Sequence, residues 1–193
     1  NHLNANKLYE MLFKQASNVQ STELRNSMSL YDLFTDDEIY DLWQINNAWW
    51  YINYGACPLN GGNQPYSQRN LLRKIISDAD SCIALPHPGV TLRYGHDTMV
   101  MPLTCLMDLD GMGMQVSDLE QLAYKGWNNY RIFPMACNIQ FVFYHKKGSK
   151  DILVKVLRNE NEATLPIKTD IAPYYHWKDV RQFYLDKINK FTE

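Results

Sequence analysis

Helix-like and strand-like patterns alternate along the chain, and this alternation constrains the fold more than any other feature. The segments with apolar residues at helical spacing are 5–20, 35–54, 68–79, 98–109 and 177–191. The segments rich in β-branched and aromatic residues are 90–94, 138–144 and 152–157. The polar turn 145–151 is expected to join the last two as a hairpin. Alternating helices and strands predict an α/β fold.

Local signals mark the ends of two of these helices. Thr35 precedes three acidic residues and predicts a helix start, because its oxygen can accept backbone N–H bonds and acidic side chains favour the positive end of the helix dipole. Gly55 is expected to end that helix. Ser67 is expected to cap the helix that follows.

Composition excludes several classes of protein. The 193 residues are 46% hydrophobic and 21% charged, which is typical of one folded domain or of a large part of a bigger one. A formal net charge of -2 gives no sign of nucleic acid binding. No apolar run reaches the roughly 20 residues that a membrane-spanning helix needs, so we expect no membrane span.

The beginning of the chain and its cysteines bear on processing and redox state. The first residues are polar, with no initiator methionine and no visible signal peptide, so we expect a trimmed or internal fragment. The cysteines are Cys57, Cys82, Cys105 and Cys137, with no C-x-x-C pair, which argues against a zinc knuckle or a thioredoxin-like motif. We expect buried free thiols, and one disulfide stays open if the protein is secreted.

The segment around Gly95, His96 and Asp97 is the candidate site for chemistry. A strand is expected to end at Gly95, where glycine permits a sharp turn, and a helix to begin at Thr98. Ligands of open α/β sheets bind at the carboxyl ends of strands, and a helix N-terminus there favours an anion. An imidazole and a carboxyl group at such an edge indicate phosphoryl chemistry. A structural interpretation stays open, in which Asp97 is only a helix cap and His96 only a surface turn residue.

Several blocks of the chain, in order, resemble the C-terminal half of the histidine acid phosphatases. This branch of the histidine phosphatase superfamily includes phytases and multiple inositol polyphosphate phosphatases. Residues 93–98, Arg-Tyr-Gly-His-Asp-Thr, and the apolar helix after them look like the second signature of the family. The other blocks are similar to family segments on either side of it: 49–55, 58–62, 134–144, 154–160 and 165–167.

The resemblance implies a three-layer α/β/α fold. Residues 1–193 would be the C-terminal part of a histidine acid phosphatase domain, with residues 1–34 from its helical cap region. The family sheet is mixed, and both halves of the chain contribute its central strands. We therefore expect an unpaired sheet edge, which contacts the missing N-terminal half or a symmetry mate.

The resemblance also implies hydrolysis of phosphomonoesters in two steps. In the family, a histidine of an N-terminal Arg-His-Gly motif attacks phosphorus, and water then hydrolyses the phosphohistidine. Carried over to this chain, His96 would stabilise the phosphoryl oxygens, and Asp97 would be the general acid that protonates the leaving alcohol. No cofactor and no metal are implied. Family members usually work outside the cytoplasm, so a periplasmic or secreted location is expected.

The chain departs from the family pattern in two places. It contains no Arg-His-Gly, and His2, His87, His145 and His176 lack the arginine neighbours of the nucleophile. We therefore expect the nucleophile on a preceding segment, and no activity from this chain alone. Inositol polyphosphate phosphatases often carry His-Ala-Glu at the position of the acid. This chain has His-Asp there, and other phytases also use His-Asp. Inositol phosphates are therefore one candidate class among phosphomonoester substrates.

Other interpretations stay open or are set aside. A non-catalytic binding or scaffolding module that kept the fold is the main alternative, and phosphoryl transfer is another. Asp108 and Asp110 lack the register of a calcium loop. Arg93 fits a phosphate contact and a salt bridge equally well. The aromatic cluster of residues 43–54 is expected in the core rather than as a ligand platform.

Overall fold

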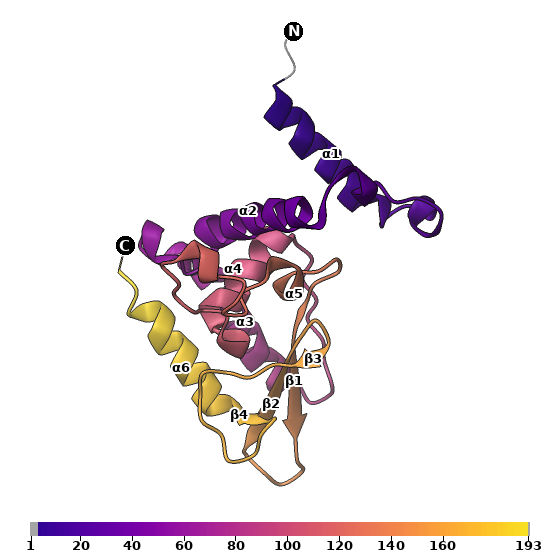
Figure 1. The fold of residues 1–193 in the computed structure, drawn as a ribbon. Coiled ribbons are helices and arrows are strands. Elements are labelled where there is room, and N and C mark those ends of the chain that lie inside the picture. The colour runs from indigo at the N-terminus through magenta and orange to yellow at the C-terminus, as the bar shows by residue number, and fades with distance from the viewer. Residues whose placement is uncertain (1–3, 193) are drawn as a thin grey trace. The chain divides into compact units, whose positions relative to one another are not determined.

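The computed structural model describes residues 4–192, and the chain divides into two compact units, Asn1–Trp49 and Trp50–Glu193. The α-helices are α1 (Ala5–Val19), α2 (Asp36–Tyr54), α3 (Arg69–Ile83), α4 (Asp97–Met107), α5 (Asn129–Ile132) and α6 (Trp177–Asn189) (Figure 1). The strands are β1 (Ile139–His145), β2 (Ile152–Arg158), β3 (Asn161–Glu162) and β4 (Tyr175–His176). Short 3-10 turns lie at Glu23–Asn26, Tyr31–Leu33, Pro58–Asn60, Gln64–Gln68, Leu109–Gly111 and Leu119–Gln121. The predicted α/β class is confirmed.

The first unit is held by aromatic contacts and by a predicted cap. The ring of Phe34 packs edge-on against Tyr9 and Phe13 of α1, with centroids 5.3 and 5.9 Å away. Thr35 and Glu38 cap the start of α2 reciprocally. The Glu38 amide donates to Thr35 Oγ1 at 3.3 Å, and the Thr35 amide donates to Glu38 Oε2 at 2.7 Å. The helix start predicted at Thr35 is therefore confirmed.

The sheet of the second unit is antiparallel. β1 pairs with β2 over seven residues, from Ile139 opposite Arg158 to His145 opposite Ile152. The other edge of β2 pairs with β3 near one end and with β4 near the other. This arrangement confirms the predicted hairpin. The mixed sheet expected from the family is not seen among the strands of residues 4–192, because every pair there is antiparallel.

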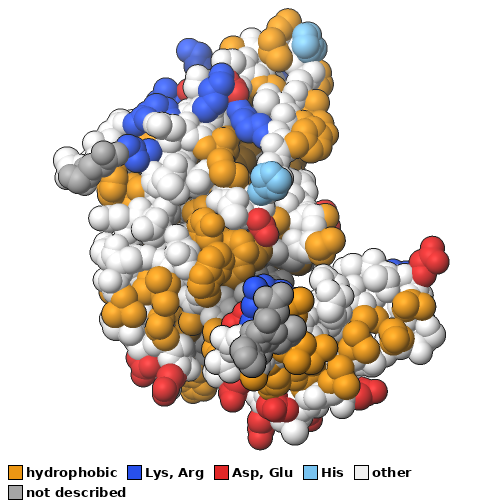
Figure 2. Space-filling view, turned by 90° about the horizontal axis from the view of Figure 1, so that it is seen from above, with side chains coloured by type: hydrophobic (Ala, Val, Ile, Leu, Met, Phe, Trp, Pro, Cys, Tyr) orange, Lys and Arg blue, Asp and Glu red, His pale blue; other side chains and the backbone are white. Residues whose placement is uncertain are grey.

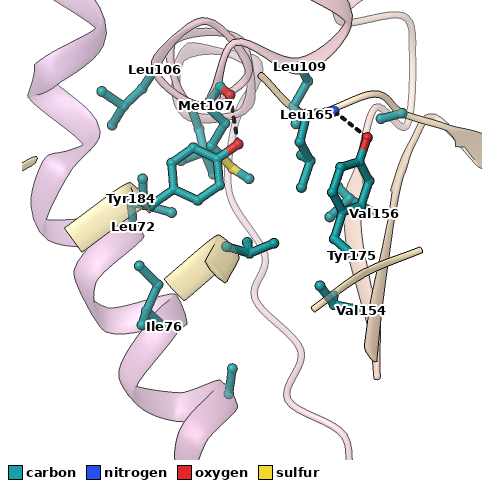
Figure 3. Packing of buried hydrophobic residues seen from close by; sticks show 14 of the residues in the cluster. Leu72, Ile76, Leu106, Met107, Leu109, Val154, Val156, Leu165, Tyr175 and Tyr184 are labelled. Atoms are coloured by element: carbon teal, nitrogen blue, oxygen red, sulfur yellow. Dashed lines mark hydrogen bonds between the residues drawn. The ribbon is translucent and has the colours of Figure 1, made fainter. Parts of the chain in front are cut away.

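The main core lies between one face of this sheet and three helices. Val154 and Val156 of β2 are fully buried together with Leu72 of α3, Leu106 of α4 and Tyr184 of α6. Figure 3 shows these side chains meeting between the helices and the strand. Because alternate residues of a strand point to the same face, the spacing of Val154 and Val156 explains why this face meets the helices. The core therefore fixes α4 against both α6 and the sheet.

A second hydrophobic cluster gathers around Tyr51. Its ring is fully buried and packs edge-on against Trp127, with centroids 5.0 Å apart. The Tyr51 hydroxyl accepts a hydrogen bond from the Val116 amide at 2.7 Å and donates to the Met114 carbonyl at 3.0 Å. Burial raises the pKa of Tyr51 to about 12. The core position expected for the aromatic cluster is thus observed at Tyr51.

Two local predictions are wrong. Residues 90–94 are not a strand: residues 88–96 have no regular structure and are exposed throughout. A strand needs hydrogen bonds from a neighbouring strand, and none of the described strands pairs with this segment. Ser67 does not cap α3. The preceding 3-10 turn, with Pro65 at its start, runs directly into the helix, and the cap residue Gln68 makes no side-chain cap bond.

Among residues 4–192, no helix is both long enough and apolar enough to span a membrane.

Candidate functional site

His96 and Asp97 lie at the N-terminus of α4. This helix is buried over Met101–Met107, while its first residue and the residue before it are exposed. The helix therefore has one end in the core and the other end at the surface. The structure brings the predicted imidazole and carboxyl group together at a helix start, in the place where the positive end of the dipole favours an anion.

The backbone at this corner is well defined. His96 is the cap residue in an extended conformation, with φ -116° and ψ 164°. Its carbonyl accepts from the amides of Met99 and Val100 at 2.9 and 3.2 Å. Asp97 Oδ1 accepts from the next amide, that of Thr98, at 2.7 Å. Asp97 therefore bonds to its own neighbour instead of capping the helix from the cap position, and both side chains remain exposed to solvent.

Two side chains of α6 hold the other end of α4. Tyr184 donates its hydroxyl to the Met107 carbonyl at 2.8 Å (Figure 3). Lys187 Nζ donates to the Leu106 carbonyl at 2.6 Å. Carbonyls at a helix C-terminus lack intrahelical partners, and a positive charge suits the negative end of the dipole. Sequence reasoning did not identify these residues as supports of α4, since no local pattern links them to it.

Burial shifts the pKa values of both supporting residues. It raises the pKa of Tyr184 well above its usual range, and the Asp108 carboxylate adds to this rise. Burial lowers the pKa of Lys187, against the opposing effect of Asp108. The phenol therefore stays protonated and remains a hydrogen-bond donor to Met107.

Cys137 lies near the His-Asp corner. Burial raises the pKa of its thiol, and the negative charge of Asp97 raises it further. Cys137 comes two residues before β1, so a residue beside the start of β1 is within range of the charge at the N-terminus of α4. No local pattern predicts this interaction, because the two residues are 40 positions apart.

Arg93 forms an ion pair with Asp78 of α3. Asp78 also accepts from Lys74 at 2.6 Å. The hydrogen bond from Lys74 and the charges of Lys74 and Arg93 lower the pKa of this carboxyl group. The sequence left two roles open for Arg93, a phosphate contact and a salt bridge, and the structure shows the salt bridge.

Asp108 and Asp110 bond to the protein around them. Asp108 Oδ1 accepts from the Gly113 amide at 2.7 Å. Asp110 Oδ2 pairs with Arg158, and its Oδ1 accepts from the Thr164 amide at 2.8 Å. Within residues 4–192, no group of three or more His, Cys, Asp or Glu side chains is placed to hold a metal ion.

The remaining cysteines and histidines differ in burial and in what lies around them. All four cysteines are free thiols. Cys57 and Cys105 are buried, and burial raises the pKa of Cys105 to about 12. Cys82 and His87 line an open cavity of about 410 Å³ at the end of α3. His2 lies outside the described residues.

Exposed apolar side chains directly precede the corner in the sequence, and a further one precedes β1. The side chains of Val90, Leu92 and Tyr94 are 79%, 67% and 92% exposed, and Met135 is 88% exposed. Figure 2 shows that hydrophobic side chains gather in patches on the visible face of the molecule. A group of exposed apolar side chains often marks a place where another chain or segment binds.

Comparison with known proteins gives relatives of one kind. No family model matches the sequence. Multiple inositol polyphosphate phosphatase 1 from Gallus gallus is 28% identical over 123 residues, which are 58% of this chain and 27% of that protein. The crystal structure of Bifidobacterium longum multiple inositol polyphosphate phosphatase in complex with inositol hexasulfate has a TM-score of 0.75 and 20% identity. The structure of its apo form has a TM-score of 0.70 and 21% identity.

These matches cover most of this chain but only part of each relative. The two solved structures match 92% of this chain, which corresponds to 38% of the solved chain. The chain thus spans well under half the length of the relatives it matches. The predicted resemblance is confirmed: the chain has the histidine phosphatase fold, and its sequence is similar to that of a multiple inositol polyphosphate phosphatase of the histidine acid phosphatase family.

Proposed function

We propose that this chain supplies the general-acid half of a phosphomonoesterase site, with inositol phosphates as the substrate class. The observation that carries the proposal is the exposed His96–Asp97 pair at the N-terminus of α4, a helix whose later part, Met101–Met107, is buried in a histidine phosphatase fold. The substrate class is supported by the names of the relatives and by the inositol hexasulfate bound to the Bifidobacterium longum enzyme.

In the proposed reaction, His96 donates a hydrogen bond to a phosphoryl oxygen, and Asp97 begins as the carboxylic acid. A histidine from another segment attacks phosphorus, so an N–P bond forms while the P–O bond to the alcohol breaks. Asp97 gives its proton to the leaving oxygen. In the second step the Asp97 carboxylate takes a proton from water as the water oxygen bonds to phosphorus and the N–P bond breaks. Inorganic phosphate leaves, and the free histidine and the Asp97 acid are restored.

The nucleophile is proposed to lie on a segment outside this chain. None of the histidines in residues 4–192, His96 included, follows an arginine or precedes a glycine as the family nucleophile does. The segment 88–96 is unpaired, and among the described residues no strand covers the second edge of β1. The charge of Asp97 also affects the pKa of Cys137, which comes two residues before β1. We propose that the nucleophile-bearing segment pairs there and completes the sheet.

Amide hydrogen exchange is expected to detect this pairing. In the isolated chain, the amides of residues 90–94 should exchange fast, because no strand of residues 4–192 pairs with them. In the full-length protein the same amides should become protected. The amides of Leu72 and Ile76 in the core provide the control and should be protected in both samples. Equal exposure of residues 90–94 in both would contradict the pairing, and protection that grows with chain concentration would indicate a second copy instead.

Phosphate release from inositol hexakisphosphate tests the activity. We expect the full-length protein to release phosphate and this chain alone to release none, because a single site is divided between two segments. Turnover by the isolated chain at the rate of the full-length protein would overturn the division of the site. A folded full-length protein with no turnover of any phosphomonoester would instead support the non-catalytic module.

Two further proposals come from the family resemblance. We place the protein outside the cytoplasm, as a periplasmic or secreted enzyme, and we assign residues 1–34 to the helical cap region of the parent domain. Fractionation of the native host, followed by immunodetection, tests the location. Recovery of the protein in the cytoplasmic fraction alone would contradict it.

A further inference from the structure

His176 lies between two carboxyl groups. Its Nδ1 is 2.8 Å from Asp151 Oδ2, and its Nε2 is 3.3 Å from Asp170 Oδ1. The imidazole side chain is 27% exposed, while those of Asp151 and Asp170 are 43% and 80% exposed. Both ring nitrogens therefore face an acceptor. We propose that His176 is a pH-sensitive clamp whose protonated ring ties the loop carrying Asp170 and the β1–β2 turn to the start of α6.

The three residues come from different parts of the fold. Asp151 ends the turn between β1 and β2, and its amide is held by Ser149 Oγ at 3.0 Å. Asp170 lies in the loop that leads from β3 to β4. His176 pairs with Leu153 across β4 and β2, and it is also the cap residue of α6. A bond to each carboxylate thus joins two loops to one helix start.

Only the protonated ring can hold both loops at once. A neutral imidazole has one N–H donor and one acceptor nitrogen, and an ionised carboxylate only accepts. The imidazolium has two donors and one positive charge, so it can bond to both carboxylates. When the proton leaves, one nitrogen and one carboxylate oxygen face each other as two acceptors. The contact with that carboxylate then becomes unfavourable.

The charged groups around the ring act in both directions, and the carboxylates prevail. The hydrogen bond with Asp151 is the largest effect that raises the pKa of His176, burial opposes it, and Asp170 adds to the rise. Asp179 in the first turn of α6 is a further negative charge on the same helix. The N-terminal end of the helix dipole acts against the imidazolium, and Lys150 and Lys178 are its basic neighbours along the chain.

The sign of the pH effect follows from the raised pKa. The folded chain binds the His176 proton more tightly than the unfolded chain does, so protonation favours the folded state. The stabilisation is complete below the pKa of an unfolded histidine, about 6.5. It is lost as the pH rises through the higher pKa of the folded state. The clamp therefore holds at and below the pH at which an unfolded histidine titrates, and it releases as the pH rises through the raised pKa of His176.

Thermal unfolding of the chain at a series of pH values from about 5 to 8.5 tests the clamp. Between the two ends of this range, the Tm of the unchanged chain should fall relative to that of His176→Gln by on the order of 2 °C, as expected for a partly exposed ion pair. His145→Gln is the matched control. His145 lies on the same hairpin, its Nε2 is 3.0 Å from the Ser149 carbonyl, and no carboxylate within residues 4–192 is paired with it. This control should keep the pH dependence of the unchanged chain.

A second variant and a direct titration make the result independent of folding defects at His176. Asp170→Asn changes a side chain that is 80% exposed, and it should reduce the pH dependence while leaving the fold intact. An NMR titration should give His176 a pKa above the ordinary value for histidine, about 6.5, and Asp170→Asn should lower it. An ordinary pKa for His176, or the same pH dependence with His176→Gln, would overturn the proposal. Neither measurement requires phosphatase activity.

Discussion

An Asp97→Asn variant of the full-length protein is expected to hydrolyse inositol hexakisphosphate about 100- to 10,000-fold more slowly than the unchanged protein, the usual contribution of a general acid. An asparagine amide has nearly the shape of a carboxylic acid but cannot transfer a proton to the leaving oxygen. The loss should appear in kcat rather than in KM, because proton transfer takes place in the transition state.

The choice of substrate separates this role from damage to the fold. An aryl phosphate with a good leaving group, such as p-nitrophenyl phosphate, needs little protonation of its leaving oxygen, so Asp97→Asn should slow its hydrolysis much less. Asp118→Asn is the matched control. Asp118 is also exposed, and its carboxylate likewise accepts from a nearby amide, that of Glu120, at 3.1 Å. Equal losses on both substrates, or an equal loss in Asp118→Asn, would argue against Asp97 as the general acid.

A Leu72→Ala variant is expected to lose about 2–5 kcal/mol of unfolding free energy, the range measured for leucine-to-alanine changes in packed cores. Leu72 is fully buried in the cluster where α3, α4 and α6 meet β2. Removing its side chain leaves a cavity there, since the surrounding helices and strand cannot collapse freely. Urea unfolding followed by circular dichroism measures the change.

Leu59→Ala is the control for the same chemical change at the surface. The side chain of Leu59 is 65% exposed, so its removal should change the unfolding free energy by less than about 0.5 kcal/mol. Similar losses in the two variants would mean that the cluster around Leu72 does not form the core of the folded chain in solution. Because this core also holds α4, Leu72→Ala should lower the thermal stability of the site as well.

The unpaired segment before His96 shows where a local pattern can mislead. Val90, Leu92 and Tyr94 alternate with polar residues, which is a strand pattern. In the structure these side chains are exposed, since a strand forms only where a neighbour supplies hydrogen bonds. In the proposed full-length protein, the same pattern would meet its partner. The failed prediction therefore identifies the surface at which the proposed pairing is to be tested.

The sequence alone determined the features that depend on near neighbours. The reciprocal cap of Thr35 and Glu38, the helices that follow apolar spacing, and the β1–β2 hairpin all join residues within a few turns or one short loop. The sequence also predicted that His96 and Asp97 stand together at a helix start, because the two residues are adjacent in the chain. These features required no knowledge of the rest of the fold.

Only the tertiary structure decided which distant residues meet. Tyr184 holds the end of α4 from 77 positions away, Asp97 acts on Cys137 across 40 positions, and His176 bonds to Asp151 across 25. Such contacts depend on how helices and strands pack, and no local pattern encodes a single partner among the many side chains of suitable type. Residues 90–94 failed to form a strand for the same reason, because a strand depends on a second segment, and no strand within residues 4–192 pairs with this one.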